Sequence, residues 1–267
     1  MGVRINTNIE ALNAQRNLGM TAVQFGKSVE KLSSGLRINR AADDAAGLAI
    51  SEKLRAQVKG LNQASRNSQD AISMVQTAEG AMNEVHSSLQ RIRELTVQAK
   101  NGTIEVGGAD ETAITNEITA LTDGIAAVIS QTSFNNAKLL DGSAGTAGVV
   151  TFQVGANAAD TLAVTFADIS GGIAALDGTD IAAVDTEISN ISGFRADLGA
   201  KQNQLESTIR NLGVASENMS ASESRIRDVD VAAEMVNFTK LQILQQAGTA
   251  ILAQANQAPQ TVLSLLR

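Results

Sequence analysis

The sequence predicts a mainly α-helical protein, an elongated rod of long antiparallel helices that form a coiled coil, with a small β-hairpin region in the middle of the chain. Apolar residues repeat with a helical period over both terminal thirds, and Pro259 is the single proline. Half of the 22 glycines gather between residues 101 and 180. A compact globule of 267 residues would be about 50 Å across, so longer helices require a rod.

The first third of the chain predicts two helices. Apolar residues recur at spacings of three and four and share one helical stripe: Ala22, Phe25, Val29, Leu32 and Leu36. Asp43 or Asp44 then predicts the N-cap of a second helix, because a carboxylate can accept the N–H groups that a helix start leaves unpaired. A helix over 45–100 would be about 84 Å long.

The glycine-rich middle predicts short elements. Two β-prone runs, 149–154 and 161–166, flank a turn-prone loop and indicate a hairpin. Residues 113–131 have the pattern of a shorter helix.

The last third has a strict seven-residue apolar period, which is typical of a coiled-coil seam. Its members are Ile191, Leu198, Leu205, Leu212, Met219, Ile226 and Ala233, and the period resumes at Leu244, Ile251 and Ala258. A long helix is therefore expected here, with both chain ends at one end of the rod.

The composition argues against several functions. There is no cysteine, and zinc-binding or triad chemistry would have to rest on a single histidine, His86. We therefore expect no enzyme, no catalytic residues, no metal site and no cofactor. A net charge of −7 argues against nucleic-acid binding, and no apolar stretch is long enough for membrane insertion. The N-terminus also lacks the pattern of a cleaved signal peptide, so export would use another route.

Long segments at both ends resemble bacterial flagellin. They are INTNIEALNAQRNL and LSSGLRINRAADDAAGLAISEKLRAQ near the start, and SRIRDVDVAAEMVNFTKLQILQQAGTAILAQANQAPQTVLSLLR at the end. Because the stretch between the terminal thirds is short, the chain is similar to a minimal form without the large variable outer domains. The resemblance implies an extracellular structural subunit of the bacterial flagellar filament, the helical propeller for swimming. Such subunits are exported unfolded through the flagellar secretion channel and polymerise at the distal tip.

The same resemblance implies a division of the chain into an inner and an outer part. Residues 1–42 and 226–267 would form an inner coiled coil. Residues 43–180 would supply the N-terminal helices and the hairpin of an outer rod, and 181–225 would supply its C-terminal helix.

The resemblance also implies partners and sites. Besides itself, the partners would be an export chaperone, hook-associated and cap proteins, and the host toll-like receptor and cytosolic sensors for flagellin. Receptor recognition and subunit packing would involve Gln90, Arg91, Glu94, Leu95 and Glu117. The inner-coil tip, read by sensors and the chaperone, would comprise Val262, Leu263, Leu265, Leu266 and Arg267. From the residues alone, the 90–95 segment is also compatible with a simple solvated helix face.

Two other functions stay open from the sequence. A hook–filament junction or cap-associated component could share the terminal coiled coil. An amphipathic helical protein that coats lipid, or an effector, would need a basic or strongly apolar face, and neither is evident.

Overall fold

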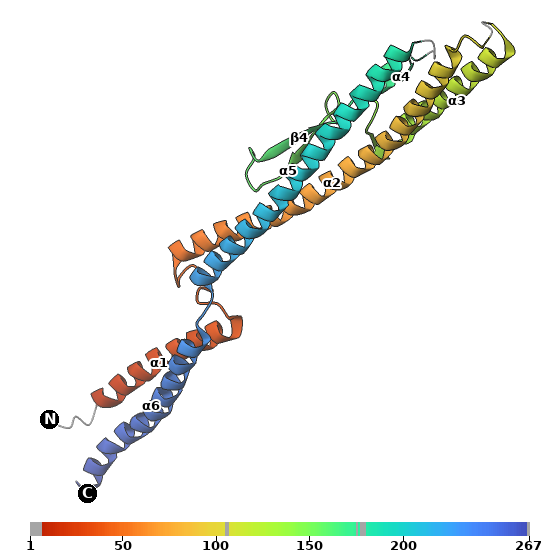
Figure 1. Cartoon of the computed structure of the whole chain (residues 1–267). Helices are drawn as coiled ribbons and strands as arrows, with labels where there is room; N and C mark the ends of the chain where they lie inside the picture. The colour runs from red at the N-terminus through yellow and green to blue at the C-terminus, as the bar shows by residue number, and fades with distance from the viewer. Residues whose placement is uncertain (1–6, 105–106, 175, 177–179, 266–267) are drawn as a thin grey trace. The chain divides into compact units, whose positions relative to one another are not determined.

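The structure, a computed structural model, describes residues 7–104, 107–174, 176 and 180–265, and the side chains of these residues as far as Gln257. The helices are α1 (Ile9–Ser34), α2 (Ala45–Ala99), α3 (Ala109–Gln131), α4 (Ser170–Ala174), α5 (Ile181–Arg227) and α6 (Val231–Leu265) (Figure 1). The strands are β1 (Ser133–Phe134), β2 (Ala137–Lys138), β3 (Val149–Gln153) and β4 (Thr161–Thr165). The mainly helical fold class with long packed helices and a small hairpin is confirmed.

The chain divides into two compact units. The terminal unit contains residues 1–56 and 219–267, and the central unit contains residues 57–218. The terminal unit thus joins segments from the two ends of the chain, and each unit is described by itself below.

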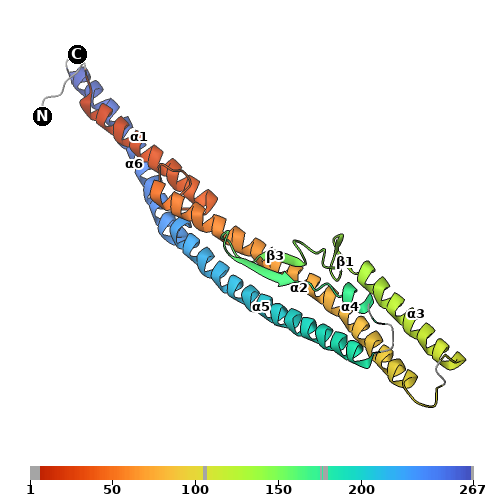
Figure 2. The ribbon, with the colours of Figure 1, turned by 90° about the horizontal axis from the view of Figure 1, so that it is seen from above.

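In the central unit, α2 and α5 run antiparallel (Figure 2). The Ser216 hydroxyl donates to the Asn62 side chain over 3.0 Å, and the Arg93 guanidinium donates to Asp185 over 2.5 Å. The separation in sequence between Asn62 and Arg93 equals that between Asp185 and Ser216. The two helices therefore keep one register over about 46 Å, without a slip.

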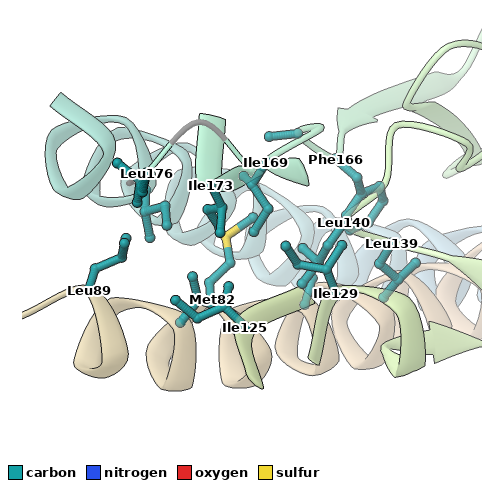
Figure 3. Packing of buried hydrophobic residues seen from close by; sticks show 14 of the residues in the cluster. Met82, Leu89, Ile125, Ile129, Leu139, Leu140, Phe166, Ile169, Ile173 and Leu176 are labelled. Carbon is teal, nitrogen blue, oxygen red and sulfur yellow. The ribbon is translucent and has the colours of Figure 1, made fainter. Parts of the chain in front are cut away.

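The core of the central unit lies where α2 and α5 meet α3, α4 and the hairpin region. Figure 3 shows Met82 and Leu89 of α2 among side chains from α3 and from the segments that flank the hairpin. Of the α5 seam, Ile191, Leu198, Leu205 and Leu212 are buried, which follows from their seven-residue spacing on one helix face.

The hairpin forms where the sequence predicts it. β3 pairs antiparallel with β4 from Val149 opposite Thr165 to Gln153 opposite Thr161. The Asn67 side chain donates to the Gln153 carbonyl over 3.1 Å and ties the hairpin to α2. Before β3, Gly145 has φ +58°, and a Cβ there would lie 2.2 Å from the Val149 carbonyl oxygen, so only glycine fits.

In the terminal unit, α1 and α6 form an antiparallel pair. The Asn8 side-chain Nδ2 donates to the Ala255 carbonyl over 2.7 Å, and the rings of Phe25 and Phe238 stack with centroids 5.0 Å apart. Between these points a Cβ on Gly248 would lie 3.1 Å from Leu18, so the helices approach closely. The side chains of the pair that face each other are mostly small or polar: Asn8, Ala11, Ala14, Leu18, Thr21, Phe25, Ser28 and Leu32 from α1, and Glu234, Phe238, Leu241, Gln245, Gly248, Leu252 and Ala255 from α6.

The prediction for the α1 stripe is partly wrong. Phe25, Leu32 and Leu36 are half-buried, but Ala22 is exposed and Val29 is 41% exposed, while Ser28 is buried. Over residues 21–32, the observed seam is rotated by about 50° around the helix from the predicted stripe. The physical reason is that the Ser28 hydroxyl donates to Glu234 Oε1 over 2.5 Å, so a polar contact occupies the seam.

The seven-residue period of the last third does not continue as one buried seam. Met219 and Ile226 are half-buried, α5 ends at Arg227, and Ala233 is exposed on α6. Leu244 and Ile251 are 46% and 58% exposed. The seven-residue repeat is present in the sequence. Beyond the interruption at 228–230, however, Ala233, Leu244 and Ile251 lie outside the side of α6 that packs against α1.

The helix ends follow ordinary capping chemistry. Asp44 Oδ1 accepts the Gly47 amide over 2.8 Å at the start of α2, and Asp230 accepts the Ala233 amide over 3.1 Å at the start of α6. The predicted cap at Asp44 is confirmed. Helix α3 begins at Ala109, before the predicted start, because Gly108 serves as its N-cap. No helix in the described part of the chain is both long and apolar enough to cross a membrane.

Candidate assembly surface

Large apolar side chains that are exposed gather in the terminal unit. Among the described residues, those of the terminal unit are Ile9, Leu12, Met20, Val23, Val29, Ile50, Val231, Met235, Val236, Ile243, Leu244 and Ile251. Those of the central unit are Val97 and Val214. An exposed apolar patch of this extent on a soluble protein marks an interaction surface.

On α1, four of these residues form one stripe. At 3.6 residues per turn, Ile9, Leu12, Met20 and Val23 fall within an arc of about 80°, opposite the side that faces α6. We call these four residues the α1 outer stripe. Helix α1 is thus apolar on two opposite sides, and α6 covers one of them. The sequence reasoning missed this stripe, although its spacing of three, eight and three residues is a helical signal.

On α6, Val236, Ile243, Leu244 and Ile251 fall within an arc of about 100°, centred about 120° around the helix from the side that faces α1. We call these four residues the α6 outer stripe; their exposed fractions range from 46% to 70%.

The α1/α6 pair has apolar side chains on both its inner and its outer side. The inner seam mixes leucine and phenylalanine with Ser28, Glu234 and Asn8, and further valine, isoleucine and leucine side chains lie outside. The pair therefore leaves part of the available hydrophobic gain, at about 25 cal/mol per Å² of apolar surface, to a further partner.

The central unit carries the predicted polar patch on α2 and α3. Arg91 donates to Glu117 Oε1 from Nη2 over 2.9 Å and from Nε over 3.1 Å, and it also pairs with Glu94 over 3.1 Å. The hydrogen bond to Glu117, followed by that to Glu94, raises the pKa of Arg91. Gln90 contacts His86 Nε2 over 3.0 Å. Four of the five predicted residues thus share one exposed surface.

The fifth residue, Leu95, lies elsewhere. It is 2% exposed and belongs to the core of the central unit. Of the predicted set, the exposed side chains are therefore Gln90, Arg91, Glu94 and Glu117. The sequence spacing of Arg91 and Leu95 does not predict that Leu95 is buried, because its burial depends on the segments that pack over α2.

The predicted C-terminal tip cannot be placed. Leu266 and Arg267 lie outside the described residues. Val262, Leu263 and Leu265 lie within α6, but their side chains are outside the described part. Elsewhere, His86 is half-buried, and no group of three or more histidine or acidic residues that could hold a metal ion occurs within the described residues.

These features define the class: a helical assembly protein that pairs its two terminal segments and has exposed apolar stripes on the paired helices. The chain belongs to the bacterial flagellin family. Residues 5–145 match the bacterial flagellin N-terminal helical region, and residues 181–266 match the C-terminal helical region. It is thus a structural subunit of the flagellar filament, in a minimal form, and flagellin filaments are extracellular.

Relatives match over almost the whole chain. The flagellin of Halalkalibacterium halodurans is 54% identical, covering 98% of this chain and 99% of the relative. The flagellin of Bacillus subtilis is 49% identical, covering 99% of this chain and all of the relative. The crystal structure of Bacillus cereus flagellin is 28% identical with a TM-score of 0.50, covering 59% of this chain and 94% of that one.

Proposed function

We propose that this flagellin polymerises by burying the α1 and α6 outer stripes against the terminal units of neighbouring copies. The observation that carries the proposal is the concentration of exposed valine, isoleucine, leucine and methionine on α1 and α6, compared with two such residues in the described part of the central unit. The α1 and α6 stripes differ in sequence and position, so a contact between different surfaces of successive copies does not close on itself and yields a helical polymer.

In this proposal, residues 1–42 and 226–267 form the inner coiled coil of the filament. Residues 43–180 and 181–225 form its outer rod. The pairing of α1 with α6 and their exposed apolar stripes support an inner position, where each helix can be surrounded by others. The larger buried core around α2, α3 and α5 supports an independently stable outer part.

The proposal extends to the path before assembly. The chain is exported unfolded through the flagellar secretion channel and polymerises at the distal tip, beside the cap and hook-associated proteins. An export chaperone covers the C-terminal segment, including the tip from Val262 to Arg267. The α6 outer stripe supports this step, because an exposed apolar surface would associate prematurely unless a partner binds it before assembly.

Seeded polymerisation tests the proposal with a matched pair of variants. Val236 is 70% exposed on α6 and Val214 is 59% exposed on α5 in the central unit. Val236→Ser should slow filament elongation on sheared seeds at least tenfold, whereas Val214→Ser should elongate like the parent chain. Equal elongation of the two variants would contradict the assignment of the surface. A parent chain that caps seeds without elongating them would favour a junction or cap component.

The exposed polar patch supports a second interaction. Gln90, Arg91, Glu94 and Glu117 bind the host toll-like receptor for flagellin, with Leu95 holding the helix surface in place from the core. Arg91→Ala should lower signalling in receptor-reporter cells about tenfold or more. Arg66→Ala, on the exposed face of the same helix, is the control. Unchanged signalling by Arg91→Ala would count against this assignment.

A further inference from the structure

The interruption between α5 and α6 has no helix breaker in its sequence. Residues 225–233 read RIRDVDVAA, without glycine or proline, and the seven-residue apolar period continues from Ile226 to Ala233 without a slip. A helix normally ends at a glycine, a proline or a side-chain cap. The Asp230 side chain caps the start of α6, but the groups at the end of α5 need partners from another part of the structure.

The N-terminal segment after α1 supplies that part (Figure 1). Gly35, with φ +73°, turns the chain at the end of α1, and the next residues lie against the end of α5. The Arg37 guanidinium donates to the Ile226 carbonyl from Nη2 over 2.5 Å and from Nε over 3.2 Å. The Arg37 amide donates to the Arg227 carbonyl over 2.6 Å, and the Val229 amide donates to the Gly35 carbonyl over 3.1 Å.

These bonds replace the ones that a continuous helix would make. In a helix, the Ile226 and Arg227 carbonyls would accept the amides of Asp230 and Val231, and the Val229 amide would donate to the Arg225 carbonyl. Each of these three backbone groups has instead a partner from residues 35–37. The segment thus satisfies the polar groups that the interruption exposes, which would otherwise oppose it.

We propose that residues 228–230 are a two-state switch: interrupted while the 35–38 segment is docked, and helical, with α5 and α6 fused into one helix, when it is released. Extending an existing helix needs no new nucleus, and each added residue closes one hydrogen bond. The α1/α6 seam contains small and polar side chains, among them Ala11, Ser28 and Gly248, so its release needs less energy than unfolding of the central core. The conformation of residues 228–230 then depends on whether the N-terminal 35–38 segment is docked on the end of α5. This conformational change is separate from polymerisation.

The structure provides a variant that blocks only the fused state. Val231 is the first residue of α6 and follows its cap, Asp230. Proline is well accepted at a first helical position, where its missing N–H has no partner. In a fused helix the same proline would lose the bond to the Arg227 carbonyl and clash with it, disfavouring that state about a hundredfold or more.

NMR of the monomeric full chain tests the switch through the backbone chemical shifts of residues 228–230. Arg37→Ala should raise their helical population at least threefold, and warming the parent chain until the α1 amides exchange should do the same. Val231→Pro should abolish both gains. Arg40→Ala, in the same loop but paired with Glu30 over 2.9 Å, should change nothing. Absence of helical gain both in Arg37→Ala and on warming, or a gain that survives Val231→Pro, overturns the proposal.

Discussion

Arg93 near the end of α2 and Asp185 near the start of α5 form an ion pair across the central unit, with Arg93 Nε 2.5 Å from Asp185 Oδ1. Both side chains are about half exposed, so the pair adds little stability at neutral pH. Its larger effect is on register, because the Asn62–Ser216 contact joins the same two helices at an equal separation along each of them.

The ion pair predicts a pH dependence. The hydrogen bond from Arg93 lowers the pKa of Asp185 below its ordinary 3.8. A carboxyl whose pKa is lower in the folded state contributes stability above its unfolded pKa, and loses it as the pH falls through its folded pKa. The central unit should thus lose stability below about pH 4. Asp185→Asn should reduce this dependence in urea unfolding measured between pH 6 and pH 2, while the part contributed by Asp141, whose pKa is lowered by its hydrogen bonds from Ser143, remains. An unchanged slope would show that the pair is not formed in solution.

Leu198 predicts a large packing effect. It is 2% exposed on the α5 seam, so Leu198→Ala should destabilise the central unit by about 2–5 kcal/mol through lost burial and a cavity. Leu12→Ala removes the same atoms from a side chain that is 52% exposed, and should leave the central unit unchanged. Denaturant unfolding followed by amide exchange of α2 and α5 distinguishes the two. A similar loss in both variants would mean that burial does not explain the effect.

Ser28 predicts a local effect on α1. Ser28→Ala removes the hydroxyl that donates a hydrogen bond to Glu234. The half-buried Glu234 carboxylate then lacks that donor, which should lower the stability of the α1/α6 pair by about 1–2 kcal/mol. Amide exchange of α1 in the monomer should accelerate about 5- to 30-fold. Ser33→Ala, at an exposed position of the same helix, serves as control. Equal exchange rates in both variants would show that the Ser28–Glu234 hydrogen bond does not stabilise the α1/α6 pair.

Replacement of glycine by alanine should change the stability in opposite directions at two positions, Gly80 and Gly145. Gly80 is exposed in α2, and an added Cβ would meet no atom within 4 Å, so Gly80→Ala should stabilise the central unit by about 0.5–1 kcal/mol. Gly145→Ala places a Cβ against the Val149 carbonyl at positive φ, and should destabilise the hairpin by more than about 1 kcal/mol. Thermal unfolding of the two variants gives the comparison, and a gain for Gly145→Ala would contradict the observed backbone.

Local sequence patterns are sufficient to predict the elements that can form in only one way. The seam from Ile191 to Leu212, the hairpin around residues 155–160 and the helix from Ala45 follow from local periodicity, turn propensity and a capping carboxylate. In each case the residues that decide the structure are close together in the sequence, so the pattern contains the information.

The tertiary structure alone decided which side of a two-sided helix is covered and where a continuous period is broken. Helix α1 could bury Val29 or Ser28, and the partner Glu234 selects Ser28. Leu95 is buried because other segments pack over α2. Residues 228–230 interrupt the helix where Arg37, near the opposite end of the chain, donates to the Ile226 and Arg227 carbonyls and the Gly35 carbonyl accepts the Val229 amide. These choices depend on partners distant in sequence, and a local pattern cannot contain them.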